Sequence, residues 1–286
     1  MADIPLEIRL VRDYRDLVSL PEVALRVNEM VDDPDCSVQA LGKVISQDPA
    51  LTMRLLGIAN SPFYGLARQV ENVAQALTLL GLQQVRNLVL ASAVSSVFER
   101  IPQELITLKD FWRHSLFCGL VAQALGERGD SRFSTLFTAG LLHDVGQLIL
   151  FHRYPEQMRE AILQQVEGGE PLDMAEAERR FIGTDHCQVG AALARQWRLP
   201  ERYIAVIAGH HDAAVAEPAH RPSVALIAIA NRIAERHLLP DEEVLADLPV
   251  ADEAWEWAGV APARAPEALA SARARIDELE RAYFLM

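Results

Sequence analysis

Cysteine is scarce in this sequence of 286 residues: Cys36, Cys118 and Cys187 are widely spaced and form no CxxC pair. Such a set gives no support for a disulfide framework or a zinc site made of thiolates, so we expect a reducing, cytoplasmic location. The phosphate-binding patterns GxGxxG and GxxxxGK followed by Ser or Thr are absent, which leaves dinucleotide-binding folds and P-loop nucleotide hydrolysis without support. Strand-like alternation of apolar and polar residues is also scarce, which disfavours β-sheet folds.

Long apolar runs and an excess of basic charge are lacking as well. Uncharged apolar stretches such as Asn87–Phe98 are too short to span a bilayer, and the N-terminus has neither the basic start nor the apolar block of a signal peptide. The net charge of -13 has the wrong sign for binding nucleic acid or an anionic membrane through the overall field. We therefore expect a soluble protein without a membrane partner and without direct contact to nucleic acid.

Hydrophobic residues make up 50% of the chain and recur at helical spacing along most of it. Residues 38–45 show this pattern, and Ser37 before them and Asp48 before Pro49 are suited to cap the helices that follow. We therefore predict an all-α fold of short helices joined by tight loops. In the second half, the predicted helices cover residues 111–126, 134–143, 155–167, 175–181, 185–197, 200–209 and 222–236.

Changes in composition divide the chain into three parts. Residues 101–110 separate an N-terminal helical subdomain, residues 1–110, from a second apolar block, residues 111–240, which we expect to be a helical core. Residues 241–286 carry 11 acidic and 4 basic side chains and are rich in Ala and Pro before a helix-favouring end. We interpret this last part as an acidic linker followed by a C-terminal helix.

Histidines are the most informative residues, because imidazoles seldom collect in apolar helical segments by chance. His143 is followed by Asp144, and a His–Asp pair at a helix end can direct an imidazole and a carboxylate to one divalent ion. Asp110 lies four residues before His114, on the same helical face. Further imidazoles, from His186, His210 and His211, would complete a nitrogen and oxygen site for iron, manganese or zinc. Such a site would polarise a phosphate and activate water.

Each of these residues alone has a more ordinary interpretation, since a single buried histidine is most often a hydrogen-bonded core residue. The combination favours a shared site, because a helical core would otherwise have to satisfy five polar side chains separately. These five are His114, His143, Asp144, His186 and His210.

The remaining histidines and Cys187 have structural interpretations. His152, His220 and His237 are interpreted as surface residues. Cys187 follows His186, but adjacent residues on a helix point about 100° apart, so we interpret Cys187 as a small buried side chain rather than a nucleophile.

Six segments resemble the HDOD family, the HD-related output domain of bacterial signalling systems. They are SLPEVALRVNEM, ISQDPALTMRLLGIANSPFYG and ALTLLGLQQVRNLVL in the N-terminal half, and LLHDVGQLIL, DHCQVGAALARQWRLP and IAGHHDA in the C-terminal half. The resemblance covers about residues 14–240. It implies an N-terminal helical bundle packed on an HD-like helical core. It also implies a role in signal transduction through contacts rather than through an established reaction.

The chain is also similar to the HD-GYP phosphodiesterases of cyclic di-GMP and to the wider HD phosphohydrolases. By that resemblance, Asp110 falls at a carboxylate ligand, and the other metal-site residues are His114, His143, Asp144, His186, His210 and His211. Two positions depart from the pattern. Gln147 stands where HD-GYP proteins have a lysine that meets the scissile phosphate, and Asn231 stands where HD enzymes commonly have the last aspartate ligand. Neither carries charge, which weakens phosphate stabilisation and metal ligation.

We therefore expect a cytoplasmic signalling module that acts by binding a signalling protein, without catalytic turnover. Its histidine pocket would be available for a divalent metal or a small phosphorylated ligand. The alternative is a metal-dependent phosphohydrolase or cyclic-dinucleotide phosphodiesterase, with the same histidines and Asp144 holding a binuclear metal centre. Gln147 and Asn231 favour the first hypothesis.

Overall fold

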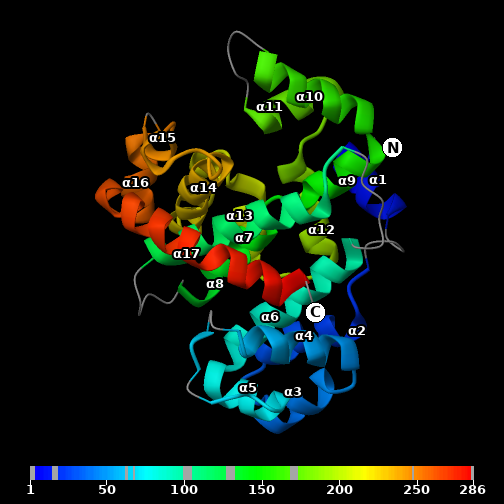
Figure 1. Cartoon of the computed structure of the whole chain (residues 1–286). Coiled ribbons are helices and arrows are strands. Elements are labelled where there is room, and N and C mark those ends of the chain that lie inside the picture. The colour runs from blue at the N-terminus through cyan, green and yellow to red at the C-terminus, as the bar shows by residue number, and fades with distance from the viewer. Residues whose placement is uncertain are drawn as a thin grey trace.

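The computed structural model describes residues 4–14, 19–61, 64–66, 68–98, 105–126, 133–167, 173–246 and 248–284. Throughout these ranges the chain forms helices joined by turns, with no strand (Figure 1), which confirms the predicted all-α fold. None of the helices in the described ranges is both long and apolar enough to cross a membrane.

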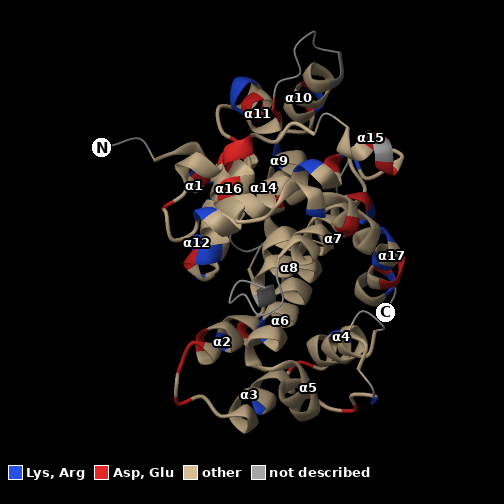
Figure 2. Ribbon diagram, turned by 90° about the vertical axis from the view of Figure 1, so that its left-hand side faces the viewer, with Lys and Arg blue, Asp and Glu red and all other residues tan. Residues whose placement is uncertain are grey.

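Four helices near the N-terminus form a separate lobe, and a fifth helix connects this lobe to the core, as Figures 1 and 2 show from two directions. The lobe contains α2 (Glu22–Val31), α3 (Val38–Ile45), α4 (Pro49–Ala59) and α5 (Val73–Leu80). Helix α6 (Leu82–Phe98) packs on α2, α4 and α5 and also on the core helix α8. Because α6 is buried on nearly all sides, its sequence is apolar around the whole helix rather than along one stripe.

Local side-chain contacts fix the ends of these helices. Ser37 Oγ accepts a hydrogen bond from Ala40 N at 3.1 Å, and Asp48 Oδ1 accepts one from Leu51 N at 3.0 Å, so both predicted caps are present. After α4, the Asn60 side chain donates to the carbonyl of Val70 and accepts from its amide. Asn60 belongs to the segment ISQDPALTMRLLGIANSPFYG, so a residue of this family-like segment links the end of α4 to Val70.

The core is built from eight further helices and the N-terminal one. Helix α1 (Leu6–Asp13) lies against α12 rather than in the N-terminal lobe. The core helices are α7 (Leu108–Leu125), α8 (Phe133–Leu142), α9 (Val145–Arg153), α10 (Pro155–Glu167), α11 (Met174–Ile182), α12 (His186–Gln196), α13 (Glu201–Gly209) and α14 (Arg221–Glu235). Helix α9 was not predicted: it lies between the predicted helices over residues 134–143 and 155–167. The backbone bends between α8 and α9 at Asp144, with φ -98° and ψ 7°.

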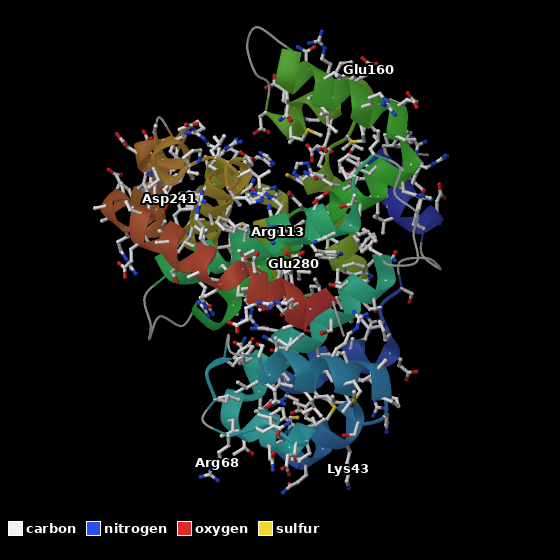
Figure 3. All side chains as sticks on the ribbon, viewed as in Figure 1. Lys43, Arg68, Arg113, Glu160, Asp241 and Glu280 are labelled. Atoms are coloured by element: carbon white, nitrogen blue, oxygen red, sulfur yellow. The ribbon has the colours of Figure 1, made fainter. Side chains whose placement is uncertain are left out.

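The C-terminal part folds back onto the core. Residues interpreted as an acidic linker contain α15 (Asp241–Leu245) and α16 (Asp252–Ala258), and α16 packs on α14 because Trp255 and Ala258 are buried. Helix α17 (Ala265–Phe284) lies along α7. Arg113 on α7 pairs with Asp277 at 2.9 Å and with Glu280, and Figure 3 labels Arg113 and Glu280 side by side.

Two close helix crossings bring the histidine-bearing segments together. A Cβ atom on Gly140 of α8 would lie 2.6 Å from the Cα atom of Gly119 on α7, and a Cβ atom on Gly146 of α9 would lie 2.0 Å from the carbonyl oxygen of His186 on α12. Only glycine permits these approaches. The crossings place the α8–α9 turn, with His143 and Asp144, between α7 and the first turn of α12.

Candidate metal centre

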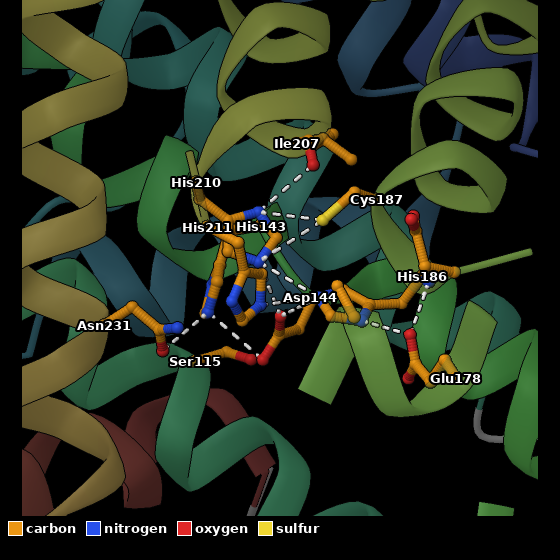
Figure 4. Close-up of polar contacts among 12 residues, drawn as sticks. Ser115, His143, Asp144, Glu178, His186, Cys187, Ile207, His210, His211 and Asn231 are labelled. Carbon is orange, nitrogen blue, oxygen red and sulfur yellow. Dashed lines mark hydrogen bonds and ion pairs between the residues drawn. The ribbon is translucent and has the colours of Figure 1, made fainter. Parts of the chain in front are cut away.

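The ends of several helices deliver imidazoles to one buried place (Figure 4). His143 and Asp144 come from the α8–α9 turn, His186 is the first residue of α12, and His210 follows the end of α13. His143 and His186 are fully buried, His210 is 2% exposed and Asp144 is 4% exposed. These residues converge because each lies at the end of a helix, and the helix ends meet at this place.

The Asp144 carboxylate lies at the centre of the cluster. Its Oδ1 atom is 3.4 Å from His186 Nε2 and 3.2 Å from His210 Nε2. Its Oδ2 atom is 3.3 Å from His114 Nε2 and 3.1 Å from His143 Nε2. Within the described chain, buried Oδ1 accepts no hydrogen bond. Each oxygen therefore faces its own pair of imidazoles, which is the arrangement of a carboxylate that bridges two ligand sets.

Partners outside the cluster fix the orientation of four of the rings. His143 Nδ1 lies 2.6 Å from the Gly140 carbonyl, and His210 Nδ1 lies 3.1 Å from the Ile207 carbonyl. The other two rings contact carboxylates. His186 Nδ1 is 2.6 Å from Glu178 Oε2, and His211 Nδ1 is 2.7 Å from Asp173 Oδ2. Each acceptor requires a proton on Nδ1, so in the neutral ring the lone pair is on Nε2 and points inward. Metal-binding histidines are oriented by outer partners in this way.

The inward nitrogens lie close to one another. His186 Nε2 is 3.1 Å from His210 Nε2 and 3.0 Å from His211 Nε2. Lone pairs that face one another at these distances repel unless a proton or a cation lies between them. Two ligands that each lie about 2.0–2.2 Å from one ion are roughly 3.0–3.4 Å apart at bond angles between 90° and 109°. The separations around Asp144 and His186 match that range, so the residues fit a divalent metal.

The charge states of the cluster are mixed. Burial raises the pKa of Asp144, but the charge on His143 and the facing imidazoles outweigh burial and hold the pKa well below its usual range. Burial and a neighbouring positive charge lower the pKa of His210 well below its ordinary value. Burial also lowers the pKa of His114 and of His186, but nearby negative charge outweighs burial, so the pKa of His114 is raised and that of His186 is held well above its ordinary value. The ionised carboxylate and the neutral His210 are in the forms that bind a metal, whereas the other two rings would release a proton on binding.

The cluster contains two groups of candidate ligands. One group is His114, His143 and Asp144, and the other is His186, Cys187, His210 and His211. The structure thus brings together six of the seven residues that the sequence indicated. Imidazole and carboxylate donors of this kind suit iron, manganese or zinc.

Asp110 is the residue that the structure places outside both groups. It lies in the first turn of α7 and is exposed, and its Oδ2 accepts a hydrogen bond from the Thr107 hydroxyl at 2.6 Å. Thr107 Oγ in turn accepts from the Asp110 amide at 3.0 Å. The structure therefore does not place Asp110 with His114 in a ligand group, because its carboxylate accepts from the hydroxyl of Thr107, the residue that caps the helix.

The two departures from the HD pattern lie beside the cluster. Asn231 Oδ1 is 3.1 Å from His143 Nε2, and Asn231 Nδ2 donates to Glu235 Oε1 at 3.1 Å. A cavity of about 400 Å³ opens over this side, and Gln147, Asn231 and Glu235 line it together with His114 and Asp144. None of the described residues that line this cavity is a lysine or an arginine.

Sequence reasoning missed three contributors. Glu178 is fully buried and holds both Nδ1 and the backbone N–H of His186. The sequence indicates the burial of Glu178 only through its position on the apolar face of α11, one turn from Met174 and from Ile182. Asp173 was missed because its contact to His211 spans 38 residues. Cys187 is buried as expected, but its Sγ lies 3.9 Å from His210 Nδ1, inside the cluster.

The other three histidines lie outside both ligand groups and are half-buried rather than simple surface residues. His152 packs edge-on against Tyr14, with ring centres 5.6 Å apart. His237 packs against Phe117, with ring centres 5.3 Å apart. His220 precedes the first residue of α14. For His152 and His237, packing of the ring against an aromatic side chain, which the sequence does not reveal, accounts for the difference.

Comparison with known proteins identifies the family. The HDOD domain matches residues 17–213, which include the N-terminal lobe and all residues of the two candidate ligand groups. This chain belongs to the HDOD family. The HDOD assignment covers the helices that carry His114, His143, His186 and His210, and it confirms the resemblance in the sequence.

Solved HDOD-like structures share the fold over nearly the whole chain. A candidate phosphohydrolase from Shewanella amazonensis SB2B is 27% identical, with a TM-score of 0.77 over 96% of this chain and 97% of that one. An HDOD domain protein of unknown function from Geobacter sulfurreducens is 26% identical, with a TM-score of 0.75 over 99% of each chain. An uncharacterised protein from Treponema pallidum (strain Nichols) is 28% identical over 76% of this chain, a match that spans 42% of that longer protein.

Proposed function

We propose that this protein is a metal-binding HDOD signalling module, which acts by binding a protein partner rather than by catalytic turnover. The observation that carries the metal part is the convergence of four Nε2 atoms on the two oxygens of Asp144. Outer acceptors on His143, His186 and His210 support it, because they fix the rings with Nε2 directed inward. The HDOD family supports the signalling part.

The charge of the adjacent cavity favours binding over phosphoester hydrolysis. A transferring or departing phosphoryl group is commonly stabilised by Lys, Arg or bound metal. Gln147 contributes an uncharged amide to the cavity, and Glu235 contributes a carboxylate that repels phosphate. No lysine or arginine is among the described lining residues, so a bound metal would have to provide the main stabilisation of the negative charge of a phosphate.

A second candidate function is metal-dependent phosphohydrolysis. It is favoured by the cavity, because Asp144, His114 and His211 line it and a ligand of moderate size can therefore reach the cluster. A solved structure named as a candidate phosphohydrolase is also 27% identical to this chain. A bound divalent ion would supply charge that polarises a phosphoryl oxygen. His114, His143, Asp144, His186 and His210 would hold it, and Gln147 would contact the substrate.

One experiment separates these functions. The protein is purified without a histidine tag or added metal, and its metal content is measured. Cyclic di-GMP and a simple phosphodiester are then assayed with manganese or iron under anaerobic conditions. Stoichiometric metal without turnover supports the proposed function. Turnover that is lost in Asp144→Ala supports the phosphohydrolase instead, and a protein that binds no metal under any of these conditions contradicts both.

The partner part has its own test. Wild-type and Asp144→Ala proteins are compared as baits for proteins of the source cell. A partner that recognises the metal-loaded module is retained by the wild type and lost with the variant. Equal recovery of the same proteins by both baits would contradict a metal-dependent partner contact.

A further inference from the structure

We propose that Cys187 is a thiolate ligand of the metal ion held by His186, His210 and His211, and that this half of the centre selects Zn²⁺. The inference rests on the metal site of the proposed function and adds to it a sulfur donor that the imidazole and carboxylate set does not contain.

The position of the sulfur carries the inference. Cys187 is the second residue of α12 and is 6% exposed. Its Sγ atom lies 3.9 Å from His210 Nδ1 and 4.0 Å from His210 Nε2, and Figure 4 shows it directed at that ring. The ligand atoms of Cys187, His186, His210 and His211 all lie within 4.8 Å of one another.

The distances require little adjustment to bind zinc. In a tetrahedral site with Zn–S near 2.3 Å and Zn–N near 2.0–2.1 Å, sulfur and nitrogen are about 3.5 Å apart. The observed 4.0 Å between Sγ and His210 Nε2 exceeds this by about 0.5 Å. A small rotation of the short cysteine side chain closes that gap.

A second observation points to an ion in the same place. Asp144 is 4% exposed, and within the described chain its Oδ1 atom accepts no hydrogen bond although it faces His186 and His210. The sulfur and this oxygen both lie near the same two imidazoles. His186 and Cys187 are adjacent in α12, and both lie near the His210 ring, which extends from the end of α13 toward them. Both can therefore contact the same ion.

The sulfur makes the two halves of the centre chemically different. Thiolate favours zinc and other soft or borderline ions, whereas carboxylate suits manganese. The half with His114, His143 and Asp144 offers only nitrogen and oxygen, so it retains a preference for harder ions. When zinc binds Cys187, the zinc–sulfur bond forms, the S–H bond breaks and the proton is released to solvent.

Cobalt substitution tests the sulfur ligand directly. Co²⁺ is added to the wild-type protein, to Cys187→Ala and Cys187→Ser, and to Cys118→Ala, which removes another buried thiol from outside both ligand groups. The double variant Cys36→Ala/Cys118→Ala leaves Cys187 as its one thiol, so it reports on Cys187 even if variants at that position fold poorly. Binding stoichiometry, circular dichroism and the near-ultraviolet thiolate-to-cobalt charge-transfer absorption are measured for each protein.

The inference predicts this absorption in the wild type, in Cys118→Ala and in the double variant. It predicts loss of the absorption in both Cys187 variants, together with a fall in zinc affinity of roughly tenfold or more. Stoichiometric cobalt without the absorption in the wild type or in the double variant overturns the sulfur ligand but leaves the metal site intact. Failure of the wild type to bind cobalt or zinc overturns both the sulfur ligand and the proposed function.

Discussion

Replacing Gly146 by alanine tests how the fold positions the metal-site residues. The added Cβ atom would lie 2.0 Å from the His186 carbonyl oxygen and 2.6 Å from the Gly190 amide nitrogen, whereas ordinary contact begins near 3.4 Å. Both atoms are backbone, so α9 and α12 must separate by about 1.4 Å at this point. Overpacking of a core typically costs about 1–3 kcal/mol, and this contact places Gly146→Ala at or above the upper end.

The same separation weakens metal binding. Asp144 lies two residues before Gly146, and its Oδ1 atom is 3.4 Å from His186 Nε2. An increase of about 1 Å would exceed the span that one ion can bridge. Urea unfolding and zinc titration of the same preparations should therefore show a loss of both stability and affinity.

Gly42→Ala is the matched control. Gly42 is also a buried helical glycine, but a Cβ atom there would lie 3.6 Å from Leu77 Cδ1, which is ordinary contact. Alanine at this position should stabilise the protein by about 0.4–1 kcal/mol and leave zinc affinity unchanged. The reasoning is refuted if Gly146→Ala matches the wild type in unfolding free energy and zinc affinity.

Three further substitutions test separate parts of the account. Asp48→Ala removes the cap of α4 and should cost about 1 kcal/mol in urea unfolding without a change in metal affinity; a loss of metal instead would contradict a purely local role. Glu178→Gln should lower zinc affinity by roughly 10–100-fold in a competition titration, because the carboxylate orients His186; unchanged affinity would rule out that role. Asp173→Asn tests a pH dependence, since His211 and Arg232 outweigh burial and hold the pKa of Asp173 below its ordinary value of 3.8. The wild type should be the more stable protein above that pH, and the difference should shrink as the pH falls below 3.8 and Asp173 takes up a proton; a constant difference in urea unfolding would contradict the assignment.

Helix positions could be predicted from the sequence where pattern and boundary signals agree. The predicted helix over residues 155–167 coincides with α10, and Ser37 and Asp48 cap the helices that they were predicted to cap. Helix α9 was missed although the predicted helix over residues 134–143 ends close to the end of α8. Within the described residues, Asp144 precedes α9 without a side-chain cap hydrogen bond, so the start of this helix lacks the cap that marks the helices after Ser37 and Asp48.

The C-terminal part shows a similar limit. Its acidic composition predicted a linker, yet the chain there folds into short helices and packs on the core. Trp255 is 8% exposed against that core, and burial of its large apolar surface outweighs the acidic composition around it.

The sequence could predict that the histidines form one site, because histidine is unusual in apolar helices. His143 and Asp144 could be recognised because they are adjacent in the sequence. Glu178 could not be found, because its role depends on the packing of α11 against α12. Asp110 lies outside both ligand groups, since helical spacing from His114 does not reveal the local contact to Thr107 that holds its carboxylate.

The most direct test of the metal centre is a crystal structure of protein loaded with zinc or manganese, with anomalous diffraction recorded at the edge of that metal. An anomalous peak is expected about 2.0–2.2 Å from Nε2 of His186 and from Nε2 of His210. The absence of any anomalous signal within this cluster, with the imidazoles still in the arrangement described, would contradict the metal centre.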